Sequence, residues 1–168
     1  MSVDHVKNID FNKVKPSRSG IIVYTRYQGK TYFILGIDTV SGDITDFGGG
    51  VSVKTENAIT GGLREFSEES LGIFGEITIE ELKRCVCVYD ESNIIIFVPI
   101  KIDISRKYYE FINRLKLIKY PEVKDLSILD TKEFISLING NDIDGNIMYD
   151  KIRKLLFSGK GSGLLRCL

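Results

Sequence analysis

Apolar positions along this chain follow two different periods, and the period changes near residue 55. Before that point, two runs rich in β-branched and aromatic residues, "SGIIVYTRY" and "KTYFILGI", are separated by the short segment "QGK". This pattern predicts a β-hairpin. The segment "ITDFGGGVSV" then predicts a short strand with a glycine turn inside it.

The second pattern predicts a helix over about residues 55–70. Its apolar stripe, at helical spacing, consists of Ile59, Leu63 and Phe66. Either Thr55 or Asn57 would cap the start of this helix, and Gly72 would end it.

The rest of the chain continues to mix the two patterns. Strands are predicted in "KRCVCVYD", "NIIIFVPIKI" and "PEVKDLSILD", and helices in "SRKYYEFINRLKLIKY", "TKEFISLI" and "GNIMYDKIRKLLF". Paired strands interrupted by helices predict an α/β fold, with a mixed sheet covered by helices on both sides. We expect residues 1–18 to be an irregular lead-in, 19–158 to form the domain and 159–168 to be a flexible tail.

Composition excludes several kinds of chemistry. The 23 Lys and Arg residues balance the 23 Asp and Glu residues, so net charge favours no particular partner. The longest apolar run is short and "SVDHVKNIDFNK" has no signal-peptide core, so we expect a cytoplasmic protein with no membrane partner. His5 is the only histidine, which argues against a histidine base or a His-liganded metal and leaves carboxylates to carry any catalysis.

The three cysteines predict packing rather than metal binding. They are Cys85, Cys87 and Cys167, an odd number without the paired spacing of a zinc site. Cys85 and Cys87 alternate on a predicted strand, so they would share one face.

The stretch "REFSEES" gathers three carboxylates in the predicted helix, those of Glu65, Glu68 and Glu69. Residues three and four apart lie on the same side of a helix, where like charges repel. Either this is a solvated helix face, or a hard divalent cation such as Mg²⁺, which prefers oxygen ligands, offsets the repulsion.

The spacing upstream of these acids favours the cation. Gly50 is followed by five residues, then Glu56, then seven residues, then "REFSEE". Six fixed residue types at fixed spacing should arise by chance in about one chain of this length in 100,000. The stretch "GVSVKTENAITGGLREFSEE" resembles the Nudix box, and the wording around it resembles Nudix proteins of large DNA viruses, which include mRNA-decapping types. The resemblance implies an α/β/α sandwich around a mixed sheet.

The resemblance also implies a metal site. Glu65, Glu68 and Glu69 would bind a catalytic Mg²⁺ or Mn²⁺, with the carbonyl oxygen of Gly49 as a further ligand. Members of this family hydrolyse a diphosphate joined to another group, by attack of water on phosphorus.

Other residues of the motif acquire roles by the same resemblance. Arg64 would hold the glutamates in place, with Glu56 and Gly50 supporting it. The general base would be Glu65, within the box, or Glu122, in the later segment "YPEVKD".

The chain departs from the family pattern in three places. The segment "EESLGI" has one extra residue before Gly72, and Phe47 and Gly48 replace the usual Pro before the Gly-Gly pair. Gly61 and Gly62 stand where helix formers are usual, which weakens the helix by about 1 kcal/mol each. A close approach of this helix to the sheet would explain them.

Substrate choice follows less directly from the sequence. Basic residues interleave with aromatic ones over residues 101–124, and the candidate substrate-binding residues are Lys101, Arg106, Lys107 and Lys124. Positive charge with aromatic rings suits capped mRNA, which makes decapping the favoured reaction. The alternatives are a diphosphoinositol polyphosphate, a nucleotide sugar or a dinucleoside polyphosphate. A Nudix-fold module that binds a nucleotide or RNA without catalysis is the alternative of another class.

Overall fold

Eight strands form one sheet in the computed structural model, which describes all of residues 1–168. The strands are β1 (Ser2–His5), β2 (Arg18–Tyr27), β3 (Lys30–Asp38), β4 (Ile44–Thr45), β5 (Phe47–Gly50), β6 (Val86–Tyr89), β7 (Asn93–Pro99) and β8 (Val123–Asp130). The α-helices are α1 (Ala58–Glu69), α2 (Ile79–Lys83), α3 (Ile104–Leu115), α4 (Thr131–Ile138) and α5 (Asp150–Gly161), and the 3₁₀ helices are η1 (Val6–Asn8) and η2 (Leu164–Cys167). None of these helices has the length and apolar character needed to cross a membrane.

The sheet is mixed, as predicted. Its main path runs β1-β6-β7-β2-β3-β4, with β5 paired to β2 and β8 paired to β3. The pairing of β2 with β7 is parallel, whereas β2 with β3 forms the predicted antiparallel hairpin. Gln28 and Gly29, with φ of 50° and 77°, make its two-residue turn, which requires positive φ at both positions.

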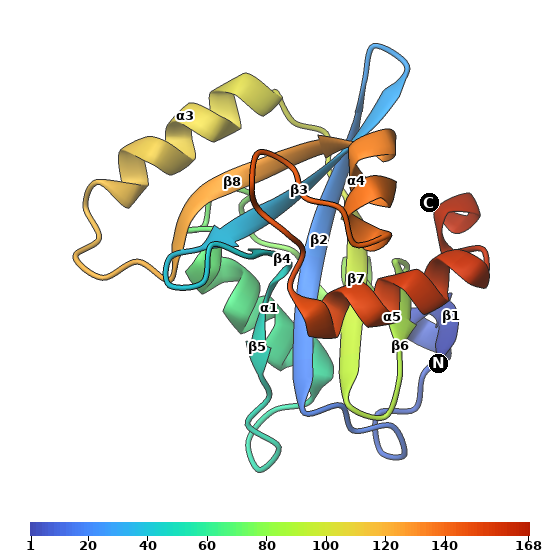
Figure 1. Ribbon diagram of the computed structural model, residues 1–168. Helices are drawn as coiled ribbons and strands as arrows, with labels where there is room; N and C mark the ends of the chain where they lie inside the picture. Colours follow the sequence, from blue (N-terminus) through green and yellow to red (C-terminus); the bar gives the residue numbers. More distant parts are fainter.

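Helices cover both faces of this sheet, which confirms the predicted fold class (Figure 1). Alternate residues of β2 point to opposite faces: Ile21 and Val23 belong to one buried cluster and Ile22 to the other. The first cluster lies beneath α1, α2 and α3, and the second lies beneath α4 and α5. Cys85 and Cys87 are buried in the first cluster as free thiols, as their alternation predicted.

Both ends of the chain are more ordered than the sequence indicated. Residues 2–5 form β1 and pair with β6, and Val6 is buried, so an irregular lead-in over 1–18 is wrong for this part. Helix α5 runs to Gly161, and Leu164 of η2 is buried in the second cluster, so the segment after residue 158 is not a free tail. Val6 and Leu164 are thus buried in the core, which the local sequence around them did not predict.

Two further elements differ from the sequence prediction. The glycine run is strand β5, paired with β2 from Phe47 to Gly50, and contains no turn. Residues 79–83, for which the hydrophobic pattern predicted no helix, form α2, whose first turn is capped by the Thr78 side chain. In both cases tertiary pairing or a short cap outweighs a weak local preference.

Candidate active site

Helix α1 begins at a defined cap and points its acidic side towards β5. The Asn57 side chain accepts hydrogen bonds from the N–H groups of Ile59 and Thr60, both at 3.0 Å. The Thr60 hydroxyl accepts a bond from the Asn57 N–H at 3.0 Å, which completes a capping box. Asn57 therefore caps the helix, and Thr55 lies before it.

The two helix glycines mark a close approach of α1 to its neighbours, as predicted. A Cβ atom on Gly62 would lie 2.5 Å from the hydroxyl of Ser19 on β2, and one on Gly61 would lie 3.2 Å from a Glu56 oxygen. The same Ser19 hydroxyl donates to the Ala58 carbonyl oxygen at 2.6 Å. Gly62 thus trades helix propensity for contact with the sheet, as expected, whereas Gly61 faces the loop before α1 instead.

The extra residue before Gly72 is accommodated after the helix has ended. Ser70 is the C-cap, and Leu71 and Gly72 follow with positive φ of 56° and 68°. The Gly72 N–H donates to the Ser67 carbonyl oxygen at 3.0 Å and closes the last turn. Only the exit of the chain is changed, so the acidic side of α1 is left intact.

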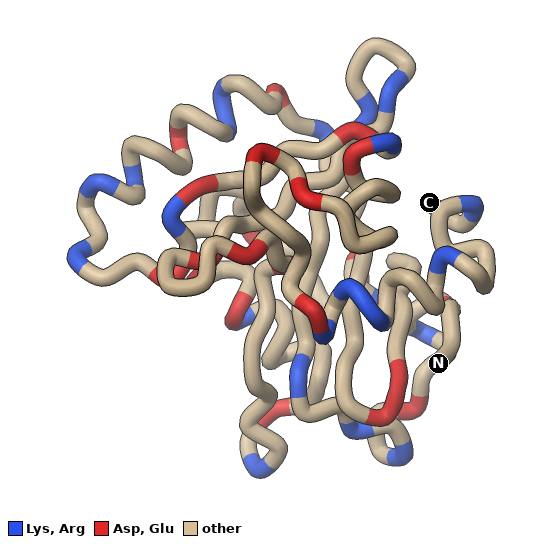
Figure 2. Tube along the Cα trace, viewed as in Figure 1, with Lys and Arg blue, Asp and Glu red and all other residues tan.

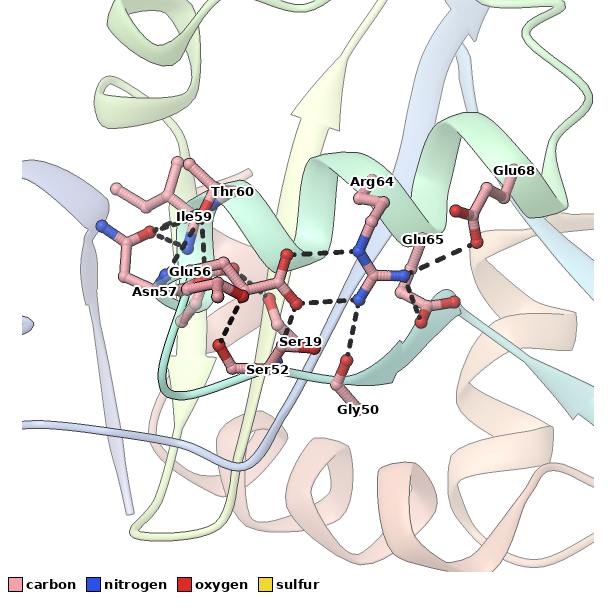
Figure 3. A network of polar contacts seen from close by, with 12 residues as sticks. Ser19, Gly50, Ser52, Glu56, Asn57, Ile59, Thr60, Arg64, Glu65 and Glu68 are labelled. Atoms are coloured by element: carbon pink, nitrogen blue, oxygen red, sulfur yellow. Dashed lines mark hydrogen bonds and ion pairs between the residues drawn. The ribbon is translucent and has the colours of Figure 1, made fainter.

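Arg64 fastens α1 to the loop after β5 (Figure 3). Its guanidinium donates to both carboxylate oxygens of Glu56, at 2.8 and 3.2 Å, and to the Gly50 carbonyl oxygen at 3.0 Å. It also donates to Glu65 at 3.0 Å and lies 3.6 Å from Glu68. The hydrogen bonds from Arg64 lower the pKa of Glu56 to about 2.

Three carboxylates converge beside β5. This group is not the set Glu65, Glu68 and Glu69 that the sequence of α1 predicted. Oxygen atoms of Glu65, Glu69 and Glu122 all lie within 4.8 Å of one another. Glu122 comes from the segment just before β8, which brings the later candidate base to the box. The Glu68 side chain is 58% exposed and pairs with Arg64, so it lies outside this group.

The inner acid of the group is in an unfavourable place for a negative charge. Burial raises the pKa of Glu69 to about 8, and the nearby carboxylates of Asp46 and Glu65 add to the effect. Its one protein hydrogen bond comes from the Gly48 N–H at 3.1 Å. Burial likewise raises the pKa of Glu65, against the opposing effect of Arg64.

These residues fit a hard divalent cation such as Mg²⁺ or Mn²⁺. Carboxylate oxygens are the preferred ligands of such ions, and a cation would offset both the burial and the neighbouring negative charges that raise the pKa of Glu69. Gly49 makes room for the arrangement, because a Cβ there would lie 2.5 Å from the carboxylate carbon of Glu65. Only glycine therefore allows β5 and the carboxylate of Glu65 to meet this closely.

Three of the four predicted substrate-binding cations line or fasten other parts of the molecule, and the fourth follows Glu122 in the sequence. Lys107 donates to the Ile73 carbonyl oxygen at 2.7 Å and to Glu110 at 3.1 Å, so it fastens α3 to the loop after α1. Arg106 lines a shallow hollow on the outer side of α3, and Lys101 lines a separate cavity beside Cys85. Lys124 is exposed, two positions after Glu122.

One ion pair beside the site was missed from the sequence. Arg18, at the start of β2, donates to both oxygens of the fully buried Asp46, at 2.6 and 3.0 Å. The guanidinium of Arg18 also lies 5.6 Å from the ring centre of Tyr149. In the sequence, Arg18 and Asp46 are visible only as charged residues next to apolar strands. No sequence pattern indicates that the two side chains pair with each other.

Comparison with known proteins gives similarity at the level of solved structures. No family model matches the chain, and no curated protein matches it. The chain is similar to a C. elegans Ap4A hydrolase in a binary complex, with 16% identity, a TM-score of 0.48 and coverage of 87% of this chain and 97% of that chain. It is also similar to the NUDIX domain of Shewanella oneidensis NrtR complexed with ADP ribose, with 10% identity, a TM-score of 0.49 and coverage of 91% and 93%. A mutT/nudix family protein from Listeria innocua gives 14% identity, a TM-score of 0.47 and coverage of 90% and 98%.

Proposed function

We propose that this protein is a metal-dependent hydrolase of the Nudix type, which cleaves a diphosphate linkage in a nucleoside diphosphate derivative. The observation that carries the proposal is the convergence of Glu65, Glu69 and Glu122 next to the glycine strand β5. Two of these acids belong to the motif and the third comes from a distant segment. A solvated helix face has no reason to recruit Glu122.

Glu65 and Glu69, with the Gly49 carbonyl oxygen, would hold the Mg²⁺ or Mn²⁺. When bound, the ion supplies neutralisation of phosphate charge and a lowered pKa for a water molecule. The Gly48 N–H orients Glu69, and Arg64 orients Glu65. The metal role predicted for Glu68 requires its side chain to leave Arg64 and turn towards β5.

Glu122 is the better placed of the two candidate bases. The Glu65 carboxylate accepts a hydrogen bond from Arg64, whereas the Glu122 carboxylate accepts none and only the Glu122 carbonyl oxygen is engaged, by the Thr39 N–H at 2.9 Å. A free carboxylate next to the ligand group can take the proton of the attacking water as the oxygen of that water bonds to phosphorus. We therefore assign proton removal to Glu122 and ligation to Glu65.

Capped mRNA is the substrate that we propose within this class. Lys and Arg residues lie along α3 and the loop that follows it (Figure 2). Tyr109 and Tyr120 are 68% and 82% exposed there, and Lys119 lies 5.3 Å from the ring centre of Tyr120. Exposed rings next to cations suit single-stranded RNA, since bases stack on the rings and phosphates pair with the cations. This loop leads directly to Glu122, so bound RNA would approach the acidic group.

A substrate panel with Mg²⁺ and Mn²⁺ tests this proposal. It should compare capped RNA, ADP-ribose, a nucleotide sugar, dinucleoside polyphosphates and a diphosphoinositol polyphosphate. We expect metal-dependent release of a nucleoside diphosphate from capped RNA. If a dinucleoside polyphosphate is cleaved efficiently and capped RNA is not, the proposed substrate is wrong and the proposed class of hydrolase still holds.

A second arm tests the assignment of the base. Glu122→Gln should lower kcat by about 10²- to 10⁴-fold, the usual contribution of a general base, with Mn²⁺ affinity nearly unchanged. The control is Glu91→Gln in the exposed β6–β7 turn, which should retain parental activity. Binding of nucleotide or RNA without hydrolysis of any member of the panel would favour the non-catalytic module instead.

A further inference from the structure

A hollow of about 320 Å³ adjoins the acidic group and shares Glu69 and Gly48 with it. Its other walls come from the β3–β4 hairpin, from the start of β2 and from the residue before α5, namely Asp38, Ser41, Asp43, Thr45, Arg18 and Tyr149. Small-ligand pockets start at about 300 Å³, so the hollow suits one ring system rather than a whole dinucleotide.

The charges around this hollow are not those of a phosphate pocket. Its one cation, Arg18, is engaged with both oxygens of Asp46 at 2.6 and 3.0 Å. The remaining ionisable groups on its walls are acids: Asp38, Asp43 and Glu69, of which Glu69 carries its charge only above about pH 8 or with a cation bound. Such walls repel phosphate and favour a group that presents N–H donors or positive charge.

The aromatic wall is held in place by the backbone. The Tyr149 N–H donates to the Ile44 carbonyl oxygen at 2.8 Å, and the Ile44 N–H donates to the Ile147 carbonyl oxygen at 2.8 Å. Met148 between them is buried. The backbone of Tyr149 is therefore fixed against β4. The Arg18 guanidinium lies 5.6 Å from the centre of its ring, so the ring face away from Arg18 is the one that a base would stack on.

The two aspartates of the hairpin differ in their availability. One oxygen of Asp38 accepts from the Val40 N–H at 2.9 Å and from the Ser41 N–H at 2.8 Å, so Asp38 holds the loop together. The side chain of Asp43 accepts no hydrogen bond from the protein and lines the hollow. Asp43 therefore has both carboxylate oxygens free to accept, whereas Asp38 has one oxygen engaged by its own loop.

We propose that this hollow is a guanine-selective base pocket, in which the base stacks on Tyr149 and donates its N1–H and exocyclic amine to Asp43. Adenine has an acceptor at N1, which the carboxylate would repel. Guanine methylated at N7 carries a positive charge and would bind more tightly still between these acids. The inference rests on the proposed function, because the diphosphate attached to the base would extend past Glu69 to the metal ligands.

Binding of mononucleotides tests the pocket apart from the chemistry, because GMP, N7-methyl-GMP and AMP have no diphosphate to cleave. We expect the parent protein to bind GMP about tenfold more tightly than AMP, and N7-methyl-GMP more tightly than GMP, since a site with a fixed acceptor rejects a base lacking the donor. Isothermal titration calorimetry gives these affinities.

Matched variants assign the preference to residues. Asp43→Asn should bring the GMP and AMP affinities to within about threefold of each other, and Tyr149→Ala should weaken both by about tenfold, the value of one stacked base. Tyr149→Phe keeps the ring and should bind like the parent. The control Asp144→Asn, in the exposed loop before α5, should also bind like the parent.

Equal affinity for GMP and AMP in the parent, or unchanged selectivity in Asp43→Asn, would overturn the guanine pocket. Hydrolysis of capped RNA together with either result would leave the proposed function standing. Guanine-selective binding that depends on Asp43, in a protein that hydrolyses no diphosphate, would support the pocket and overturn the proposed function instead.

Discussion

Glu56 and Glu69 lie at opposite ends of the acidic segment, and the pKa values of these two identical side chains are shifted in opposite directions. Hydrogen bonds from Arg64 lower the pKa of Glu56 to about 2, whereas burial next to other acids raises the pKa of Glu69 to about 8. Glu56 has its cation within the protein, and Glu69 forms no ion pair. Glu56 holds the motif together through Arg64. Glu69 is the acid whose negative charge a bound cation would stabilise most.

Replacing Glu69 should have the largest effect on activity. Glu69→Gln keeps an oxygen for the Gly48 N–H but loses the negative charge, so we expect metal-dependent kcat to fall by about 10³-fold or more. The melting temperature at pH 8 should be equal to or above that of the parent, because a buried charge is removed. Steady-state kinetics and circular dichroism provide the two readouts. A variant with parental kcat would contradict the role of Glu69.

The second largest effect should be a pH dependence of metal binding, which arises from Glu69 and not from Glu56. Below about pH 8 a cation must displace a proton from Glu69, so Mn²⁺ affinity should rise about tenfold per pH unit between pH 6 and 8 and then level off. Without metal, folded Glu69 keeps its proton above the ordinary pKa of 4.5, so stability contributed by this group should fall from there to about pH 8.

Calorimetric titration of Mn²⁺ at several pH values measures the first trend, and thermal unfolding with a chelator measures the second. Glu69→Gln is the matched control, since it should lack this part of the pH dependence of stability. An Mn²⁺ affinity that is flat from pH 6 to 8 in the parent would argue against a protonated Glu69.

Loss of the fastening at Arg64 should have a smaller effect. Arg64→Lys keeps the charge but loses the fork that reaches Glu56, Glu65 and the Gly50 carbonyl oxygen together. We expect kcat to fall by about 10- to 100-fold while Mn²⁺ still binds. Kinetics over a range of Mn²⁺ concentrations distinguishes the two. Activity equal to that of the parent would show that the fork is dispensable.

The smallest effect should appear in stability alone. Gly62→Ala places a Cβ 2.5 Å from the Ser19 hydroxyl. Overpacking of this kind costs about 1–3 kcal/mol and the gain in helix propensity returns about 1 kcal/mol, so the free energy of unfolding should fall by up to about 2 kcal/mol. Urea denaturation measures it. Gly161→Ala in α5 is the control, because a Cβ there meets nothing within 4 Å and should not destabilise. Equal stability of the two variants would refute the close approach of α1 to β2.

Local features of the site could be predicted from the sequence. Helical period predicted α1, and the resemblance implied the support of Arg64 by Glu56, which lies only two turns before it. The reason for Gly62 was an expected approach to the sheet, and its partner Ser19 is distant in sequence. The period also placed Glu68 with Glu65 and Glu69. In the structure Glu65 and Glu69, one turn apart, face β5, while Glu68 turns outward to Arg64.

Contacts between distant segments could not be predicted in the same way. The Arg18–Asp46 pair joins residues 28 positions apart through the pairing of β2 with β5. Tyr149 reaches the same region because its backbone bonds to β4. These contacts follow from the order of strands in the sheet, which a hydrophobic pattern does not contain. Glu122 was a candidate base by resemblance, but its position beside Glu65 is likewise a product of the sheet.

The most direct test of the metal site is a calorimetric titration of Mn²⁺ at pH 8 into the parent, Glu69→Gln and Glu56→Gln. We predict one site whose affinity falls at least about tenfold in Glu69→Gln and changes less than about threefold in Glu56→Gln. Parental affinity in Glu69→Gln, or equal losses in the two variants, would contradict a cation held by the buried end of the acidic segment.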